Sequence, residues 1–334
     1  AHVYHLYGTL MQEQSKYEDS EKLLIKALDA KAACYAPGHP EIYNAMSDYG
    51  NNLADLGKFE AAEGFLTDYH DYCLSSFEPD DSELLVAAGN LGSLYHAMGE
   101  IEKARKTYEE ALTNAGEVSS GEPVDASLNL YTNLASLYSA VGEFDKADEL
   151  LASAVTDLER SEKQDPDKYV SILITQGNIA TSRGGYKEAK RIYQKAVDTA
   201  QDSYGKETPL AITALFNLST IYNYLGDYAD QDRALLRCME LMEGAYGPNH
   251  PDLAAVCVNR ASLFVRLGQN EEAQRMYAKA LEINESIFGE DHYKLAANLY
   301  GLGLILSDQG KLEQANKAFV RAMELLEDQE VDQS

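Results

Sequence analysis

The stretch 130–154 sets out a pattern that the rest of the chain repeats. Apolar residues recur three and four apart on two successive segments, first at Leu134, Leu137 and Tyr138 and then at Ala147, Leu150, Leu151 and Ala154. Because this spacing matches the helical period, it predicts two amphipathic helices. Gly142, between them, can adopt the left-handed backbone that ends a helix. We expect Ala135 and Ala147 to lie where the two backbones approach most closely.

The turn glycine recurs along the chain at a nearly fixed interval. It is found at Gly57, Gly99, Gly142, Gly184, Gly226, Gly268 and Gly310, with Ser15 in its place in a first copy, and every step is 42 residues except one of 43. We number each copy so that this residue is position 15. Position 8 is always Gly, Ala or Ser, and position 20 is small except at Gln231. A fixed period of this length predicts a solenoid of helical hairpins, which we call helix A and helix B.

These residues resemble the tetratricopeptide repeat. The small residue in helix A, the turn glycine, the alanine in helix B and an aromatic at position 17 fit its pattern, the last at Tyr17, Phe59, Phe144, Tyr186 and Tyr228. The usual repeat has 34 residues, and the eight more found here add about two helical turns. This longer form, with linkers such as Gly38-His39-Pro40, is similar to the repeat domain of kinesin light chains. The heptad segment that would join a heavy chain is absent from these residues, so the resemblance does not establish kinesin membership.

The resemblance implies an all-α fold, a right-handed superhelical solenoid of about eight repeats. We expect one array over 1–328, followed by an acidic tail at 329–334. The expected repeats cover about 1–35, 41–77, 83–116, 126–161, 168–203, 210–245, 252–287 and 294–328. The chain does not begin with Met, and we expect it to be a piece of a longer protein. Because no polar capping helix follows the last repeat, we also expect possible self-association through uncapped terminal repeats.

Several repeats depart from the pattern. Tyr69 replaces a packing alanine, and we expect its ring to widen the local helix spacing or to project outward. Core leucines are replaced by Gln176 and Arg260, and we expect altered superhelical twist in repeats 5 and 6, which contain Gln176 and Gln231. The single 43-residue step falls in the loop 117–123, where one extra residue costs little.

Charge and composition narrow the classes of partner. The formal net charge is −27, of which residues 1–167 carry −21 and residues 168–334 carry −6. Phosphate groups bind clustered Lys and Arg, so this balance argues against nucleic acid and anionic membrane as partners. The acidic surface can serve solubility alone, or it can attract a basic partner. No apolar run approaches the length of a membrane span.

The sequence contains no catalytic constellation. Phosphate-loop, zinc-protease, nucleophile-elbow and EF-hand spacings are all absent, so we expect no enzyme activity, no cofactor and no metal site. Four widely spaced cysteines, Cys34, Cys73, Cys238 and Cys257, are expected to be reduced and mostly buried, which favours a cytoplasmic location. His39, His250 and His292 occupy equivalent linkers. They could form a metal or pH-sensing site, but we favour the simpler interpretation that each caps its own helix junction.

In this fold helix A lines the concave wall, and we expect positions 2, 5, 6, 9, 12 and 13 to face inward. Asparagine, a poor residue for a helix interior, recurs there. A side-chain amide can pair with the backbone of an extended peptide, and peptide-binding members of the family use asparagine in this way. Alternatively, each amide bonds to the neighbouring repeat and shapes the superhelix. The predicted groove residues are Asn51, Asn90, Asn133, Asn178, Asn217, Asn259, Phe216, Tyr224, Tyr300 and Arg266.

The sequence therefore predicts a non-catalytic protein-interaction scaffold that holds an extended peptide segment of a partner. Inner-wall Lys and Arg are nearly absent, which argues against an acidic cargo and against a clamp for a terminal carboxylate. We expect a neutral to basic segment with apolar anchors. Two alternatives stay open. The array could be a structural spacer or oligomerisation unit, or it could regulate a catalytic or DNA-binding part of a larger protein.

Overall fold

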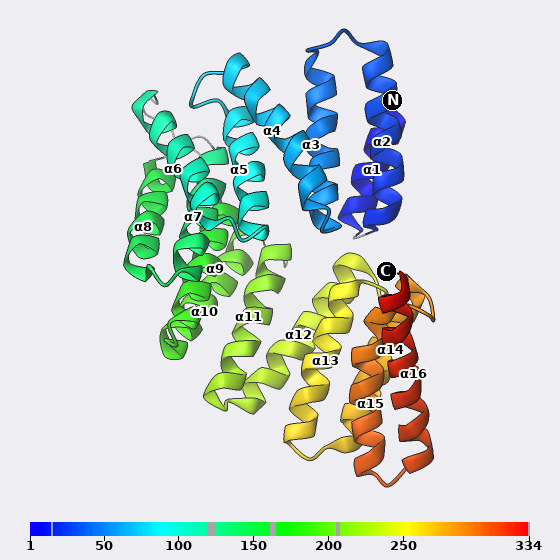
Figure 1. Ribbon diagram of the computed structural model, residues 1–334. Coiled ribbons are helices and arrows are strands. Elements are labelled where there is room, and N and C mark those ends of the chain that lie inside the picture. Colours follow the sequence, from blue (N-terminus) through cyan, green and yellow to red (C-terminus); the bar gives the residue numbers. More distant parts are fainter. Residues whose placement is uncertain (15, 119–124, 161–164, 205–207, 333–334) are drawn as a thin grey trace. The chain divides into compact units, whose positions relative to one another are not determined.

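The computed structural model describes residues 1–14, 16–118, 125–160, 165–204 and 208–332 (Figure 1). Within these ranges the regular structure consists of α-helices and one 3₁₀ turn, with no strand, so the predicted all-α array of helical hairpins is confirmed. The chain divides into two compact units, residues 1–168 and 169–334. Each unit is built from hairpins in which a helix packs against the one before it and the one after it.

The helices alternate between A and B along the chain. The first four hairpins are formed by α1 (His2–Glu13) with α2 (Tyr17–Cys34), α3 (Pro40–Asp55) with α4 (Phe59–Ser76), α5 (Ser82–Ala97) with α6 (Ile101–Val118), and α7 (Asp125–Ala140) with α8 (Phe144–Arg160). The next four are α9 (Pro166–Ser182) with α10 (Tyr186–Tyr204), α11 (Pro209–Leu225) with α12 (Tyr228–Tyr246), α13 (Pro251–Arg266) with α14 (Asn270–Phe288), and α15 (Ala296–Asp308) with α16 (Leu312–Asp332). The 3₁₀ turn η1 (Tyr293–Leu295) precedes α15.

The turn glycines close helix A as predicted. All seven have φ between 71° and 82°, a conformation that costs little only for glycine. The residue after each glycine donates its N–H to the carbonyl at position 11, as Glu143 does to Tyr138 at 2.8 Å. This six-to-one hydrogen bond is the Schellman motif, which satisfies a carbonyl that the helix end leaves unpaired. Ser15, the equivalent residue of the first repeat, lies outside the described residues.

Position 8 of helix A is small because a large side chain of helix B packs against it. At Gly92 an added Cβ would lie 2.4 Å from the ring of Tyr108, and at Gly177 it would lie 2.5 Å from the ring of Tyr193. Both rings are buried. Leucine at the position of these tyrosines also comes close, since an added Cβ would lie 2.7 Å from Leu24 at Gly8 and 2.9 Å from Leu66 at Gly50. Repeat 4 nevertheless has alanine at position 8 beside Leu151. Ala135 and Ala147 are fully buried.

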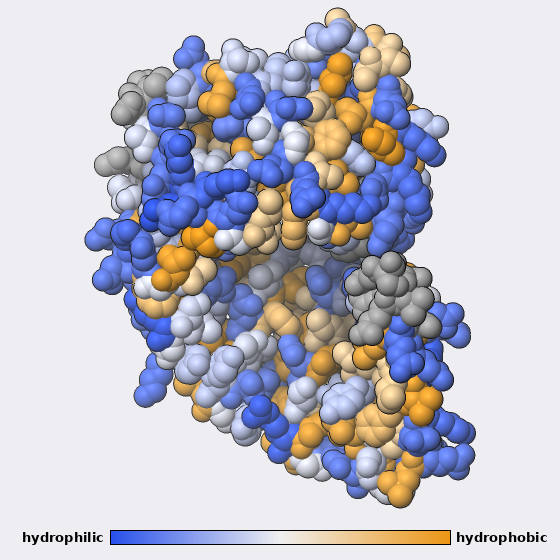
Figure 2. Space-filling view, in the orientation of Figure 1, coloured by the Kyte–Doolittle hydropathy of each residue, from blue (hydrophilic) through white to orange (hydrophobic). Residues whose placement is uncertain are grey.

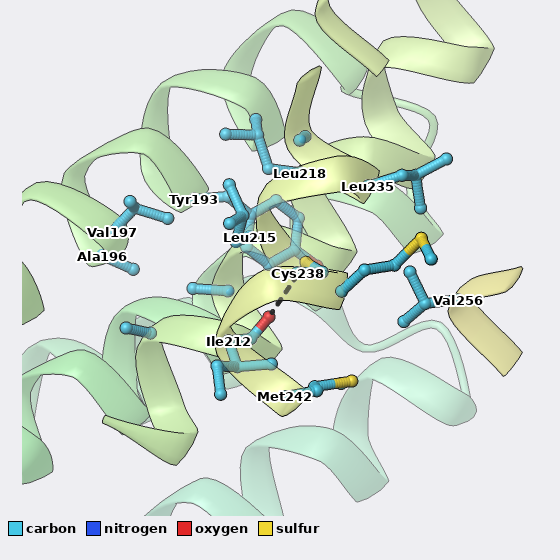
Figure 3. Close-up of a cluster of buried hydrophobic side chains, with 14 of the residues drawn as sticks. Tyr193, Ala196, Val197, Ile212, Leu215, Leu218, Leu235, Cys238, Met242 and Val256 are labelled. Atoms are coloured by element: carbon cyan, nitrogen blue, oxygen red, sulfur yellow. Dashed lines mark hydrogen bonds between the residues drawn. The ribbon is translucent and has the colours of Figure 1, made fainter. Parts of the chain in front are cut away.

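The core of the second unit is a continuous apolar cluster over α9 to α14, part of which Figure 3 shows. Leu215 and Leu218 of α11 and Leu235 of α12 lie around the Cys238 thiol, whose Sγ is 3.9 Å from the Ile212 carbonyl oxygen. Burial raises the pKa of the Cys238 thiol to about 12. All four cysteines are free, and they are buried except Cys34, as the sequence predicted.

Three expectations need comment. Tyr69 does not project outward, because its ring is buried and its hydroxyl donates to Glu83 Oε1 at 2.6 Å. Gln231 is also buried, and its Oε1 has no hydrogen-bond partner among the described residues. Helix α16 continues to Asp332, so most of the segment expected as a tail is helical. The loop expected at 117–123 lies largely outside the described residues.

Candidate functional site

Asparagines at position 6 are connected to the preceding repeat. In the first unit Asn90 Nδ2 donates to Ser47 Oγ at 3.3 Å, and Asn133 Nδ2 donates to Ser93 Oγ at 3.4 Å. These pairs run from one helix A to the next, since α3, α5 and α7 contact one another in succession. We call the residues at positions 6 and 9 of helix A the amide face. All three predicted residues of this unit, Asn51, Asn90 and Asn133, are partly exposed.

The amide face of the second unit follows the same pattern. Asn217 Nδ2 donates to Asn178 Oδ1 at 3.4 Å, and the Tyr193 hydroxyl donates to the same oxygen at 2.5 Å. Asn178 is exposed, and Asn217 and Asn259 are partly exposed. Asn51 and Asn259 make no side-chain hydrogen bond within the part of the chain that the structure describes. Three of the asparagine amides therefore do bond to the neighbouring repeat, as the alternative to peptide binding required, but these hydrogen bonds are long.

Position 6 of the second repeat, Asp48, belongs to an ionic network around the buried Lys31. Asp48 accepts from His5 Nε2, and Lys31 Nζ lies 2.9 Å from His5 Nδ1 and 2.9 Å from Glu41 Oε2. The Lys31 ammonium, a donor to Glu41, holds the pKa of that carboxyl below its usual value. Since Lys31 is almost completely buried, its charge must be compensated by these partners. The Asp48 carboxylate is thus paired with His5 of the first repeat, and this pair joins the two repeats.

The predicted aromatic residues divide into two kinds. Phe216 is partly buried and packs against the core of the second unit. Tyr224 and Tyr300 are 56% and 57% exposed, although Tyr224 stacks on Tyr186 with ring centroids 4.6 Å apart. Stacking fixes the orientation of the Tyr224 ring while leaving one of its faces accessible. The aromatic set is therefore neither wholly core nor wholly surface.

Two arginines near the amide face differ in availability. Arg260 Nε donates to Asp232 Oδ1 at 2.7 Å, and its guanidinium lies 5.1 Å from the centre of the Phe264 ring. Arg266 is exposed and makes no ion pair with any residue that the structure describes. Only Arg266 offers an unengaged cation among the predicted groove residues, all of which lie in the described ranges.

The linker histidines cap helices, as we favoured. The Nδ1 atom accepts from the backbone N–H two residues on, at 3.2 Å for His39, 3.3 Å for His250 and 3.2 Å for His292. Each imidazole also lies against the aromatic ring four residues earlier, as His39 does on Tyr35 with ring centroids 4.2 Å apart. Among the described residues no group of three or more His, Cys, Asp or Glu side chains could hold a metal ion.

Sequence reasoning missed the tyrosines that support the amide face. Tyr108 OH lies 3.0 Å from Ser93 Oγ, and Tyr193 OH bonds to Asn178, so each hydroxyl joins position 24 to position 9. A signal was present, because tyrosine at position 24 accompanies glycine at position 8 in both repeats. The ring passes over the glycine and reaches the polar residue beyond it.

Two hollows in the first unit lie away from the amide face. One, of about 450 Å³, is lined by Ala32, Pro37, Gly38, Ile42, Tyr43, Met46 and Asp68. The other, of about 100 Å³, is lined by His70, Leu74, Pro79, Leu84, Ala88, Thr107, Glu110, Ala111 and Asn114. Neither of these two hollows contains a predicted groove residue.

A family model for the tetratricopeptide repeat matches residues 1–75, 83–160, 169–230, 233–286 and 255–328, and a second one matches 212–252. The chain belongs to the tetratricopeptide repeat family. No curated protein matches it in sequence. None of the helices in the described ranges combines the length and apolar character that a bilayer crossing needs.

Solved structures share the fold at low sequence identity. BtubC (BKLC) from P. vanneervenii is 21% identical with a TM-score of 0.64, over 69% of this chain and 92% of that one. A Rap protein complexed with Competence and Sporulation Factor is 16% identical with a TM-score of 0.59, over 92% and 80%. A putative kinesin light chain repeat protein from Podosopora anserina is 16% identical with a TM-score of 0.49, over 61% and 96%.

Proposed function

We propose that this chain is a non-catalytic scaffold that holds an extended segment of a protein partner along its amide face. The observation that carries the proposal is the recurrence of asparagine at positions 6 and 9 across six repeats, where a helix gains nothing from it. Membership of the tetratricopeptide repeat family supports a binding role. A structural neighbour, the Rap protein, is complexed with Competence and Sporulation Factor, which is a further support.

The hydrogen bonds of the amide face are compatible with capture of a peptide. The amide donors of Asn90, Asn133 and Asn217 lie 3.3 to 3.4 Å from their acceptors, beyond the usual range for N–H···O bonds. Such long bonds contribute little, so a peptide backbone could replace them at low cost and with better geometry. The contacts between repeats would then hold the amides in position before a ligand arrives.

The partner segment is neutral to basic and carries apolar anchors. The exposed rings of Tyr224 and Tyr300 supply apolar surface in the second unit, and residues 1–167 carry a net charge of −21. A basic segment would be attracted to that surface, and the attraction would fall with salt. Free thiols are the usual state in a reducing compartment, so the proposal includes a cytoplasmic location.

The test is a double substitution, Asn133→Ala with Asn217→Ala, in the whole chain. Linear peptides are first selected from a displayed random library on the wild-type chain, and their affinities for the variant are then measured by fluorescence anisotropy. Each lost amide–backbone bond should weaken binding by up to about tenfold. The melting temperature should change little, because alanine's better helix propensity offsets two weak bonds.

A matched control separates the groove from the rest of the surface. Asn114→Ala changes an exposed asparagine on helix B of the third repeat, away from the amide face. This variant should bind the selected peptides as the wild type does. If the double variant retains full affinity while it remains folded, the amide face does not bind the partner.

A further inference from the structure

The two hollows of the first unit occupy the same place in consecutive repeats. Each is lined by residues at positions 32, 37 and 42 of one repeat and at positions 4 and 26 of the next. They lie beside the linkers α2–α3 and α4–α5, which Figure 1 shows at the same end of the hairpins. We call them the linker hollows. The residues at these positions are Ala32, Pro37, Ile42, Met46 and Asp68 in the first hollow, and Leu74, Pro79, Leu84, Ala88 and Glu110 in the second.

Position 26 is basic in every repeat of the second unit. Two of these side chains pair with position 32 of the preceding repeat: Lys279 with Glu243, and Arg321 with Glu285, where Nη2 lies 2.9 Å from Oε1. Arg321 also donates to the carbonyl oxygen of Glu290 at position 37, at 3.1 Å. A basic side chain therefore crosses the place that a linker hollow occupies in the first unit. The four basic residues are Lys195, Arg237, Lys279 and Arg321.

In the second and third repeats position 26 carries the opposite charge. Asp68 and Glu110 are exposed, and the residues at position 32 before them are Ala32 and Leu74, which carry no charge. Within the described ranges Asp68 makes no ion pair, and Glu110 pairs with Lys106 of its own helix at 3.6 Å. Because a carboxylate side chain is shorter than a lysine or an arginine, it leaves the hollow open and places a negative charge beside it.

The surface around the linker hollows has few cations. Residues 40–118 contain 16 acidic and 4 basic side chains, a net charge of −12. His70 also lines the second hollow, and burial lowers its pKa, so it is neutral at pH 7. On the face that Figure 2 shows, hydrophilic side chains cover most of α4, α5 and α6, with hydrophobic ones between them. Each hollow therefore combines apolar walls with a carboxylate that pairs with no cation of the preceding repeat.

We propose that the linker hollows bind arginine side chains of a basic segment of a protein partner. In each hollow the methylene stem of the arginine packs against the apolar residues, and its guanidinium pairs with Asp68 or Glu110. The arginine then takes the place that Arg321 takes between repeats 7 and 8. Arginine fits better than lysine, because a guanidinium is more weakly hydrated and can pair with a carboxylate through two hydrogen bonds. The linker hollows are separate from the amide face, so this binding does not depend on a peptide there.

The repeat determines the spacing of the arginines. Equivalent points on neighbouring repeats are about 10 Å apart, which is the distance between packed helices. A segment in the polyproline II conformation has three residues per turn and rises about 3.1 Å per residue. Its residues i and i+3 therefore lie on one side, about 9 Å apart. We expect a segment with arginines three residues apart.

The experiment places arginine at position 26 beside both hollows. Asp68→Arg with Glu110→Arg recreates the arrangement of the second unit, and both residues are exposed, so the fold is retained. The probe is a fluorescein-labelled glycine–serine peptide with two arginines three residues apart, and its affinity is measured by fluorescence anisotropy. The variant should bind it about tenfold more weakly than the wild type or worse, because two attractions become two repulsions. The wild type should bind the same peptide with glutamine in place of both arginines about as weakly.

A matched control separates the hollows from the general acidity of the unit. Glu60→Arg with Glu102→Arg changes exposed residues at position 18 of α4 and α6 and alters the net charge by the same amount. Position 18 lies about 12 Å from position 26 along the helix, which exceeds the Debye length of about 8 Å at physiological salt. This control should retain the wild-type affinity within about threefold. Asn133→Ala with Asn217→Ala, on the amide face, should bind the arginine peptide as the wild type does.

Three results would overturn the proposal. These are a hollow variant that binds the arginine peptide as tightly as the wild type, a position-18 variant that loses as much affinity as the hollow variant, and a wild-type chain that does not distinguish the arginine peptide from the glutamine peptide. If only the amide-face variant loses affinity, the peptide binds there, and the linker hollows are excluded while the proposed function stands.

Discussion

Replacing Gly92 with alanine tests the packing rule that shapes the hairpins. The added Cβ would lie 2.4, 2.7 and 2.8 Å from Cε1, Cζ and Cδ1 of Tyr108. That ring is buried, and its hydroxyl lies 3.0 Å from Ser93 Oγ, so it cannot move without losing contacts. Overpacking of this kind costs about 1–3 kcal/mol, and loss of the hydrogen bond adds about 1 kcal/mol. The better helix propensity of alanine offsets about 1 kcal/mol of this destabilisation.

We therefore expect Gly92→Ala to destabilise the chain by about 1–3 kcal/mol, although the same change in an open helix would stabilise it. For a unit of this size the melting temperature should fall by about 2–4 °C per kcal/mol, measured by circular dichroism. The second arm is Tyr108→Leu, which recreates the combination of Ala135 with Leu151 found in repeat 4. In that background Gly92→Ala should destabilise the chain less than it does beside Tyr108, because the end of a leucine side chain can move aside more easily than a buried ring, although leucine still comes within 2.9 Å of an added Cβ at Gly50. If Gly92→Ala alone melts at or above the wild-type temperature, the steric argument is wrong.

Two further expectations concern buried phenols and helix caps. Burial raises the pKa of Tyr193 to about 12, and burial together with the hydrogen bond to Glu109 raises that of Tyr138 to about 12. An unfolded tyrosine has a pKa of about 10, so this stabilisation is complete below that pH and is lost as the pH rises towards the folded-state pKa. Melting temperatures should therefore fall between about pH 10 and about pH 12, and less steeply in Tyr193→Phe. His250→Ala removes the acceptor for the Asp252 N–H and should lower the free energy of unfolding, measured in urea, by about 1 kcal/mol. His250→Asn and His250→Asp supply shorter side chains that also accept a hydrogen bond, and they should restore the cap.

Features that depend on local chemistry were predictable from the sequence. The turn glycines follow from their spacing, because each occupies a left-handed position that other residues avoid. The histidine caps follow from their place before Pro40 and Pro251, which favour the first turn of a helix. Asp81 shows that the site needs an acceptor and not an imidazole, since its Oδ1 accepts from Glu83 N–H at 2.8 Å.

Features that depend on contacts between repeats were not predictable in detail. The asparagines were placed on one face by their period, but their acceptors lie about one repeat away along the chain, as Asn133 and Ser93 do. The identity of an acceptor depends on how far one helix A is shifted along the next, which no single-repeat pattern contains. For Tyr69 the sequence left two outcomes open, and burial of the ring excludes outward projection. Its hydroxyl finds Glu83 in the following repeat, so the ring can be buried without leaving a polar group unpaired.

The asparagine series ends before repeat 8 because of the way Tyr277 packs. In repeats 3 and 5 the tyrosine at position 24 lies over glycine at position 8 of its own repeat. Repeat 7 has Ala261 there, and the Tyr277 ring instead lies over Gly301 of the next repeat, where an added Cβ would be 2.5 Å away. Gly301 occupies position 6, so an asparagine side chain cannot be accommodated. The amide face therefore stops after Asn259, and α15 presents the exposed apolar side chains of Tyr300 and Leu304 in its place.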